Sequence, residues 1–169
     1  MAHNIRFPQM WDIITNHIDF KDKTLLDIGF GYGDLLKAAH SAGAKVYGID
    51  QAAELVSNLR VYNSTTFNVR RANIEEIFYS KETLPKVDIL TCFSVLPYLS
   101  DPDKMLNYFS GLSPQVLIEC QYAGDGPGLD WLKGDADMQI WLDTIWYDVE
   151  KIGETKVEGR GYRSIWLCQ

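Results

Sequence analysis

Three glycines at alternate positions follow a short apolar segment near the start of the chain. The segment is Thr24-Leu25-Leu26-Asp27-Ile28, and the glycines are Gly29, Gly31 and Gly33. Glycine lets the backbone turn tightly and lets a ligand lie against the main chain. Helical periodicity resumes at Asp34, so the glycines join a buried strand to a helix, as they do in nucleotide-binding turns. The segment therefore predicts a ligand site at the carboxyl end of a strand.

Two acids next to these segments narrow the chemistry of the ligand. Asp27 lies two residues before the first glycine, and a second apolar segment, Lys45–Ile49, ends on Asp50. A carboxylate at the end of the second strand can accept both hydroxyls of a ribose. Asp34 begins the helix, where a pyrophosphate would be repelled. An acid before the glycines suits an ammonium group, so an adenosyl amino acid is favoured over a nicotinamide dinucleotide.

Strand-like and helix-like segments alternate along the chain and must position these residues. A continuous apolar run bounded by turn residues predicts a buried strand, and apolar residues at i, i+3, i+4 and i+7 predict a helix. The expected strands are 24–29, 45–50, 65–70, 87–93 and 115–120, and the expected helices include 7–18, 34–42, 52–59, 74–78 and 135–145. A helix opens at Asp101-Pro102, and the segments 147–156 and 162–168 predict a terminal antiparallel hairpin. Strands that are apolar throughout predict a parallel sheet with helices on both faces.

Length, charge and cysteine use limit the class of protein. With 169 residues the chain is expected to form one domain over 1–169, with a leading helix in 1–22, βα units over 23–146 and the hairpin over 147–169. The formal net charge of −7 argues against nucleic acid as a partner. Three scattered cysteines, Cys92, Cys120 and Cys168, predict a reduced cytoplasmic chain without a disulfide framework or a metal site. No apolar run approaches the roughly 20 residues of a membrane span, so no membrane role is expected.

The stretch from Leu25 to Gly33 resembles the first motif of class I S-adenosylmethionine-dependent methyltransferases. Three further segments of this chain resemble motifs of that family: Gly48-Ile49-Asp50, Ala72-Asn73-Ile74 and the stretch from Val87 to Leu96. The resemblance covers nearly the whole chain, although Phe30 stands where the family often has Cys or Ala. It implies an α/β fold: a doubly wound, Rossmann-like, seven-stranded and mostly parallel sheet of order 3-2-1-4-5-7-6, with the last strand antiparallel.

The resemblance also implies S-adenosyl-L-methionine as the cofactor, S-adenosyl-L-homocysteine as the product, and a role for each site residue. The backbone of Gly29, Phe30, Gly31 and Gly33 would lie beneath the methionine part, and Asp27 would orient its amino group. Asp50 would hold the ribose. The remaining expected contacts are Gln51, Asn73 and Ile74 at the adenine, and Phe93 and Ser94 at the methionine end.

Few residues are available to recognise a methyl acceptor. Tyr98 follows the fourth strand, Glu119 lies at the end of the fifth strand and Tyr122 follows the fifth strand. All three are weak candidates for a catalytic role, which otherwise stays unassigned. The segment from Arg6 to Trp11 could fold over the cofactor, and the glycine-rich stretch from Ala123 to Gly128 could form a lid. The expected acceptor is a small molecule or a protein, and the expected state is a monomer or homodimer. Two alternatives stay open: a non-catalytic cofactor- or partner-binding module, and a nicotinamide-dependent oxidoreductase.

Overall fold

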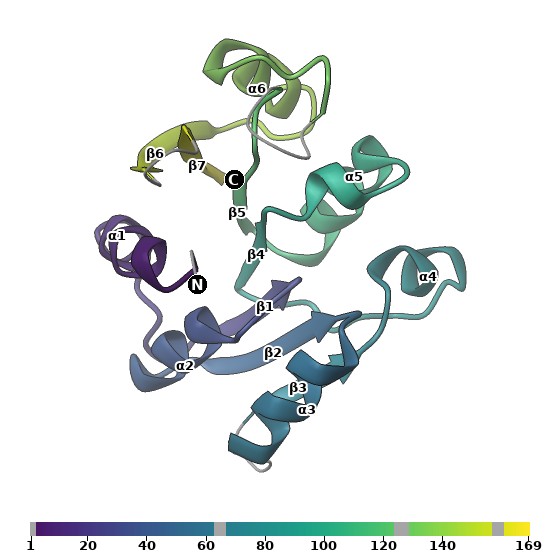
Figure 1. Ribbon diagram of the computed structural model, residues 1–169. Coiled ribbons are helices and arrows are strands. Elements are labelled where there is room, and N and C mark those ends of the chain that lie inside the picture. The colour runs from purple at the N-terminus through teal and green to yellow at the C-terminus, as the bar shows by residue number, and fades with distance from the viewer. Residues whose placement is uncertain (1–2, 63–66, 124–128, 157–160) are drawn as a thin grey trace.

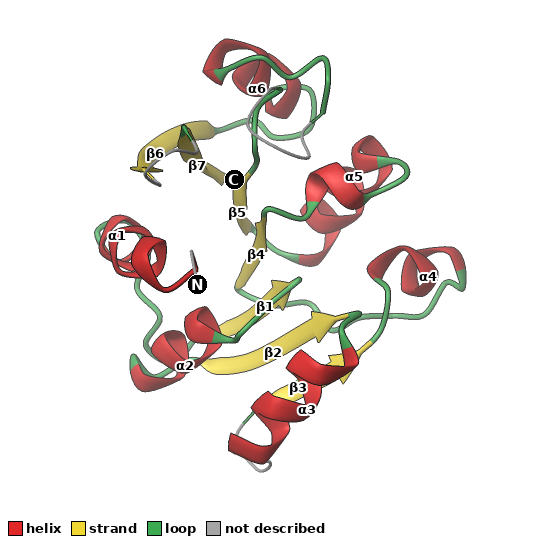
Figure 2. Ribbon diagram, viewed as in Figure 1, coloured by secondary structure: helices red, strands yellow, loops and turns green. Residues whose placement is uncertain are grey.

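The computed structural model describes residues 3–62, 67–123, 129–156 and 161–169. Within these ranges the strands are β1 Thr24–Ile28, β2 Lys45–Asp50, β3 Asn68–Arg71, β4 Ile89–Phe93, β5 Gln115–Glu119, β6 Val149–Lys156 and β7 Tyr162–Cys168. The helices are α1 His3–Thr15, α2 Asp34–Ser41, α3 Ala53–Tyr62, α4 Ile74–Tyr79, α5 Pro102–Leu112 and α6 Asp135–Leu142, with a 3₁₀ turn at Leu96–Tyr98. Figure 2 shows the helices arranged around a central sheet.

The described strands form one seven-stranded sheet in the order β3-β2-β1-β4-β5-β7-β6. Neighbouring strands from β3 to β5 are parallel, and β7 runs antiparallel to both β5 and β6. This confirms the expected strand order and the antiparallel last strand. The order reverses between β1 and β4, and in such sheets ligands bind at the carboxyl ends of the strands beside that point.

Two apolar layers hold the helices against the sheet. Residues of α1, α2 and α3 pack on one face, and residues of α4, α5 and α6 pack on the other. Figure 1 shows α1 and α2 on the opposite side of the sheet from α4 and α5. Alternate residues of a strand point to opposite faces, so Leu25 joins the α1 layer while Leu26 and Ile28 join the α4 layer. Asp27 is two residues after Leu25 on the same strand, so its side chain points to the same face of the sheet, towards α1 and α2.

Several element boundaries differ from the predicted ones. The first helix begins at His3 and ends at Thr15, whereas the pattern predicted 7–18. Ile14 and Ile18 are both buried, so the apolar stripe reports burial and continues past Thr15, the last residue of the helix. The third strand is Asn68–Arg71, and positions 65–66 of the expected strand lie outside the described residues. A helix opens at Asp101-Pro102 as predicted. Of Ser100 and Asp101, the two possible caps, Asp101 is the one that caps α5, because its Oδ1 accepts from the Lys104 amide at 3.1 Å.

No helix in the described part of the chain is long and apolar enough to cross a lipid bilayer.

Candidate functional site

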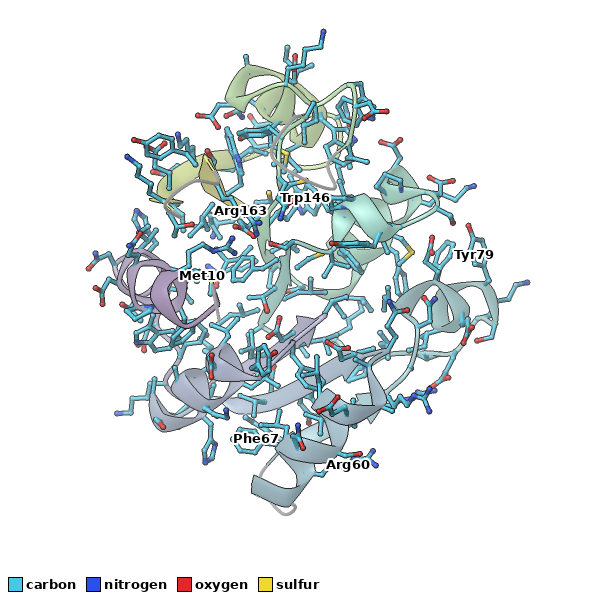
Figure 3. The ribbon with its side chains drawn as sticks, in the orientation of Figure 1. Met10, Arg60, Phe67, Tyr79, Trp146 and Arg163 are labelled. Atoms are coloured by element: carbon cyan, nitrogen blue, oxygen red, sulfur yellow. The ribbon has the colours of Figure 1, made fainter. Side chains whose placement is uncertain are left out.

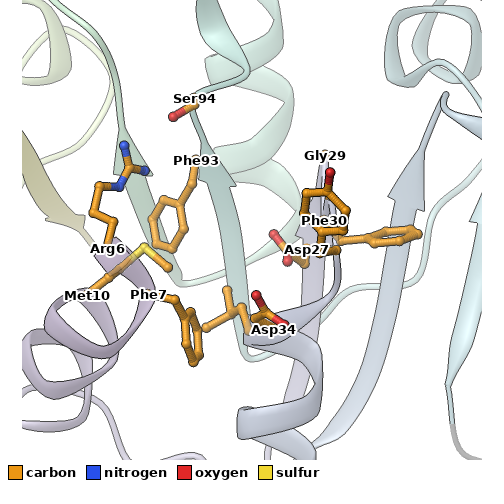
Figure 4. A pocket seen from close by; sticks show the side chains of 12 residues that line it. Arg6, Phe7, Met10, Asp27, Gly29, Phe30, Asp34, Phe93 and Ser94 are labelled. Carbon is orange, nitrogen blue, oxygen red and sulfur yellow. The ribbon is translucent and has the colours of Figure 1, made fainter. Parts of the chain in front are cut away.

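A cavity of about 90 Å³ lies at the carboxyl ends of β1 and β4, between the sheet and the helices α1 and α2. It is lined by Arg6, Phe7, Met10, Asp27, Gly29, Phe30, Gly31, Tyr32, Asp34, Leu35, Phe93 and Ser94. Figure 4 shows their side chains gathered from α1, β1, the glycine turn and β4. Six of the eleven predicted cofactor residues are in this lining: Asp27, Gly29, Phe30, Gly31, Phe93 and Ser94. The expectation that the segment from Arg6 to Trp11 covers the site agrees with the presence of Arg6, Phe7 and Met10.

The three glycines of the turn have different roles, although each has a positive φ of 74°, 56° or 74°. A β-carbon on Gly29 would lie 2.4 Å from Val95 Cγ2, and one on Gly33 would lie 2.8 Å from Leu59 Cδ2. A β-carbon on Gly31 would meet nothing within 4 Å. Gly29 and Gly33 therefore allow the turn to pack against its neighbours, whereas Gly31 leaves open space over the main chain at the cavity.

Asp27 is a carboxylate in the wall of the cavity and is only 4% exposed. Its Oδ1 accepts a hydrogen bond from Thr91 Oγ1 at 2.8 Å, across the β1–β4 pair. Burial raises its pKa from 3.8 to about 7; the Thr91 hydrogen bond opposes that rise, and the nearby charge of Asp50 adds to it. A buried carboxylate of this kind is stabilised by a cation that shares its pocket.

Asp50 lies next to the cavity and is held by the main chain. It is 9% exposed; its Oδ2 accepts from the Gly31 amide at 3.0 Å and its Oδ1 from the Ala52 amide at 2.8 Å. The hydrogen bond from the Gly31 amide connects the end of β2 to the glycine turn that follows β1. Each oxygen still has lone-pair capacity for a further donor.

The residues expected at the adenine lie outside the cavity lining, beyond β2. Asn73 caps α4, because its Oδ1 accepts from the Glu75 amide at 2.8 Å. Its amide nitrogen has no hydrogen-bond partner in the described residues. Gln51 is exposed, and Ile74 is 5% exposed within the α4 layer of the core. Gln51 and the half-buried Asn73 are accessible to solvent, and we call the surface that they form beside Asp50 the open edge.

A polar cluster lies at the β4–β5–β7 side of the cavity, and we call it the arginine cluster: Arg6, Ser94, Glu119 and Arg163. Arg6 NH2 lies 2.7 Å from Glu119 Oε1. Ser94 Oγ donates to Glu119 Oε2 at 2.6 Å and accepts from Arg163 NH1 at 2.6 Å. Glu119 is fully buried, and both arginines are less than a tenth exposed. Residues two apart on a strand point to the same face of the sheet. Glu119 is two residues from Leu117 and Arg163 is two residues from Ile165, and both of these apolar residues pack in the α1 layer. Glu119 and Arg163 therefore face α1, as Asp27 does. Figure 3 shows Arg163 on the side of the sheet where α1 and Met10 lie.

Three weak catalytic candidates thus have different surroundings. Glu119 belongs to the arginine cluster and is absent from the cavity lining. Tyr98 ends the 3₁₀ turn and is 65% exposed, also outside the lining. The Tyr122 hydroxyl forms a hydrogen bond with Asp135 at the start of α6. Burial, and to a smaller extent this hydrogen bond, raises the pKa of Tyr122 to about 12.

Metal and thiol chemistry find no support in the described part of the chain. It holds no group of three or more His, Cys, Asp or Glu side chains that could bind a metal ion. Cys92, Cys120 and Cys168 are free and buried, and burial raises the pKa of each thiol. Of the proposed lid, positions 124–128 lie outside the described residues.

Sequence reasoning did not single out Arg163, and it named Arg6 only as part of a segment. A signal existed for Arg163, because it is the one charged residue of a mostly apolar strand that also carries Ile165 and Leu167. Its partners come from β4 and β5, so only the folded sheet reveals the cluster.

The fold and the glycine turn together define a Rossmann-like domain, with the cavity at the switch point of its sheet. A family described as "Methyltransferase domain" matches residues 26–115, which is more than half of the chain. The chain belongs to this methyltransferase domain family. The match runs from β1 through the beginning of β5 and includes the glycine turn, Asp50 and Asn73.

Curated relatives with the same printed name are similar over part of the chain. The ubiquinone biosynthesis O-methyltransferase of Pseudoalteromonas translucida is 30% identical over 93 residues, which is 54% of this chain and 39% of that protein. The enzyme of that name from Actinobacillus pleuropneumoniae serotype 7 is 33% identical over 85 residues, 47% of this chain and 36% of that protein. The matched parts thus span about two fifths of these relatives.

Solved structures share the fold over almost the whole chain. The magnesium protoporphyrin IX methyltransferase of Synechocystis PCC 6803, solved with bound SAM, has a TM-score of 0.70 at 17% identity and covers 95% of this chain and 75% of that one. The bifunctional kinase-methyltransferase WbdD has a TM-score of 0.77 at 19% identity, over 95% of this chain and 39% of that one. At these identities the likeness concerns the fold.

Proposed function

We propose that this protein is a methyltransferase that binds S-adenosylmethionine in the cavity at β1 and β4. The observation that carries the proposal is the buried Asp27 carboxylate in the cavity wall, whose pKa is raised to about 7. An ammonium ion placed there would stabilise the ionised carboxylate by a charge-assisted hydrogen bond. The methionine part of the cofactor supplies such an ammonium group.

The residues around Asp27 fit the rest of an adenosyl amino acid. Gly31 offers open main chain at the cavity, where any β-carbon would occupy the space of the ligand. The cavity of about 90 Å³ is small beside typical ligand pockets of roughly 300–1,000 Å³. It therefore suits the amino-acid end of a ligand, with the nucleoside lying along the open edge beside Asp50. Two carboxylates in the lining, Asp27 and Asp34, oppose a pyrophosphate and so disfavour a nicotinamide dinucleotide.

The polar residues along that edge suit a nucleoside. Asp50 already has its two oxygens oriented by the amides of Gly31 and Ala52, so it is preorganised to accept two ribose hydroxyls. Asn73 keeps its amide nitrogen available for the adenine edge while its oxygen caps α4. In this proposal Gln51 covers one face of the adenine from its exposed position, and Ile74 supports the other face from the core.

Methyl transfer requires little further chemistry from the chain. S-adenosylmethionine supplies the electrophilic methyl group on its sulfonium sulfur. The protein must align the acceptor with that methyl group and exclude water. Phe93 borders the cavity from the end of β4, and Phe7 and Met10 close it from α1; these apolar side chains keep water from the reacting atoms.

The relatives support a small molecule with an oxygen nucleophile as the acceptor. The two curated relatives described above are named as ubiquinone biosynthesis O-methyltransferases, and they carry residues beyond the matched segment. We therefore propose O-methylation of a small molecule as the reaction class.

Calorimetry tests the cofactor assignment. S-adenosylhomocysteine should bind the protein with one site per chain, and NADH should not bind. Asp27→Asn should weaken the binding of S-adenosylhomocysteine, and Asp19→Asn, which changes an exposed acid outside the cavity lining, should leave it unchanged. Binding of NADH in preference would refute the proposal. Turnover of S-adenosylmethionine with a panel of small-molecule acceptors then distinguishes an enzyme from a binding module.

A further inference from the structure

Residues 94–101 join β4 to α5, and we call them the β4–α5 segment. The segment starts at the cavity, because Ser94 belongs to the lining. Val95 packs on the glycine turn so closely that a β-carbon on Gly29 would lie 2.4 Å from its Cγ2. The start of the segment therefore forms part of the wall around the proposed site for the amino-acid end of the cofactor.

This part of the wall has a backbone conformation that needs support. Ser94 has a φ of 58°, in the left-handed region that is uncommon for a residue with a side chain. Such a conformation costs free energy and persists only where the surrounding contacts impose it. At this end of the segment the Ser94 amide donates to the Glu119 carbonyl at 2.8 Å. In the middle, the side chain of Leu96 is fully buried. How the other end is held therefore bears on the shape of the wall.

The other end of the segment is held by Glu75, a half-buried acid of α4. Its Oε1 accepts from the Ser100 amide at 2.9 Å and from the Ser100 hydroxyl at 2.6 Å. The amide of Glu75 in turn donates to Asn73 Oδ1 at 2.8 Å. Figure 1 shows α4 and α5 on the same side of the sheet. Because Asn73 belongs to the open edge, one carboxylate connects that edge to the β4–α5 segment.

The structure of α4 suits it to carry this connection. The helix has six residues, and so short a helix depends on its tertiary contacts rather than on its own hydrogen bonds. Its first turn contains both the residue that follows the Asn73 cap and the carboxylate that holds Ser100. A ligand that restrains the Asn73 side chain therefore restrains Glu75 as well. Hydrogen bonds to a carboxylate are stronger than those between neutral groups, which helps the restraint reach Ser100.

We propose that Glu75 is a positioning residue that couples the open edge to the cavity. When a nucleoside binds along the open edge, Glu75 holds Ser100 and thereby keeps the β4–α5 segment in the shape that the amino-acid end of the cofactor requires. The inference rests on the proposed function, since it takes the nucleoside and the amino acid to be two parts of one ligand. It adds that the two parts bind cooperatively.

Hydrogen exchange with adenosine as the probe tests the coupling, because adenosine lacks the amino-acid part. The Tyr98 amide donates to the Val95 carbonyl at 2.9 Å and the Leu99 amide to the Leu96 carbonyl at 3.2 Å, so both amides report on the order of the segment. Saturating adenosine should slow their exchange by about fivefold in the wild-type protein. It should have no such effect in Glu75→Ala. An equal slowing in that variant would overturn the proposal.

Calorimetry separates coupling from a merely structural role. Glu75→Ala should weaken S-adenosylhomocysteine by about fivefold and leave adenosine within about twofold, because only the larger ligand uses the wall that Ser94 forms. An equal loss for both ligands would mean that Glu75 only supports α4. No loss for either would mean that its contact with Ser100 serves only the start of α5. Either of these results would overturn the proposal.

Further variants make the test specific. Glu75→Gln keeps an oxygen for both Ser100 donors, so it should restore the slowing of exchange and most of the affinity. Ser100→Ala removes one of the two hydrogen bonds and should give a smaller change in the same direction, which keeps the test available if Glu75→Ala does not fold. The matched control is Glu76→Ala, which removes an exposed acid from the same turn of α4 and should change neither ligand.

The proposed function fails in a different way. If the wild-type protein binds neither S-adenosylhomocysteine nor adenosine, the cofactor assignment itself is refuted. If it binds both and Glu75→Ala behaves as the wild type does, only the coupling is refuted.

Discussion

Replacing Asp27 with asparagine should stabilise the free protein at pH 8 and at the same time weaken its binding of S-adenosylhomocysteine. The side chain is 4% exposed and accepts a hydrogen bond from Thr91. Asparagine has the same shape and keeps an oxygen for Thr91, so the substitution removes the charge with little change in packing. Its two effects have opposite signs, which separates a ligand-binding carboxylate from one that serves the fold.

The effect on stability follows from the pKa of the carboxyl group. Its pKa is about 7 in the folded protein and 3.8 in the ordinary, unfolded setting. Between these values the folded protein binds more protons than the unfolded chain, so the free energy of unfolding falls as pH rises from about 4 to 7. At about 1.36 kcal/mol for each pH unit, the ionised carboxylate destabilises the free protein at pH 8 by on the order of 4 kcal/mol. Asp27→Asn should recover a large part of this amount.

The effect on binding has a pH dependence of its own. Because an ammonium ligand requires the ionised carboxylate, its affinity for the wild-type protein should fall roughly tenfold for each pH unit below about 7. Between pH 8 and pH 5.5 this amounts to a loss of about thirtyfold. The Asp27→Asn protein should bind about tenfold or more weakly at pH 8, and its affinity should vary little over the same range.

Urea unfolding and calorimetry at pH 8 and 5.5 measure both effects. The control is Asp34→Asn, which changes a second, more exposed carboxylate of the lining and should alter stability by less than about 0.5 kcal/mol. A wild-type affinity that does not change between the two pH values would refute the assignment of Asp27 to an ammonium group. An Asp27→Asn protein that is less stable at pH 8 would refute the account of its burial.

Four further substitutions test the rest of the site. Asp50→Ala should weaken S-adenosylhomocysteine by about 1–3 kcal/mol in calorimetry, and an unchanged affinity in a folded variant would rule out ribose binding by this residue. Gly31→Val should abolish the binding of S-adenosylhomocysteine. Gly29→Ala should mainly lower the midpoint of thermal unfolding, because the new β-carbon would lie 2.4 Å from Val95 Cγ2. Equal behaviour of the two variants would contradict the distinct roles of these glycines. Asn73→Ala should lower the free energy of unfolding by about 1 kcal/mol through loss of the α4 cap, and it should weaken adenosine binding only if the amide also contacts adenine.

The sequence by itself determined the sheet and the cofactor end of the site. Apolar runs that alternate with amphipathic segments require a covered parallel sheet, and the glycines between Ile28 and Asp34 occur where a strand must turn sharply into a helix. The same local logic placed Asp27 and Asp50 at strand ends, since residues within one βα unit fix the chemistry there. Boundaries such as that of α1 were predicted less well, because Ile18 is buried without being helical.

Only the tertiary structure decided the arginine cluster and the separate roles of the glycines. Arg6, Glu119 and Arg163 are far apart in the sequence, and they meet because β4, β5 and β7 are neighbours and α1 lies over them. Gly29 and Gly31 have the same local pattern, and the side chain of Val95 alone distinguishes them. Local periodicity reports which face of an element is buried, whereas the partner across that face depends on how the whole chain packs.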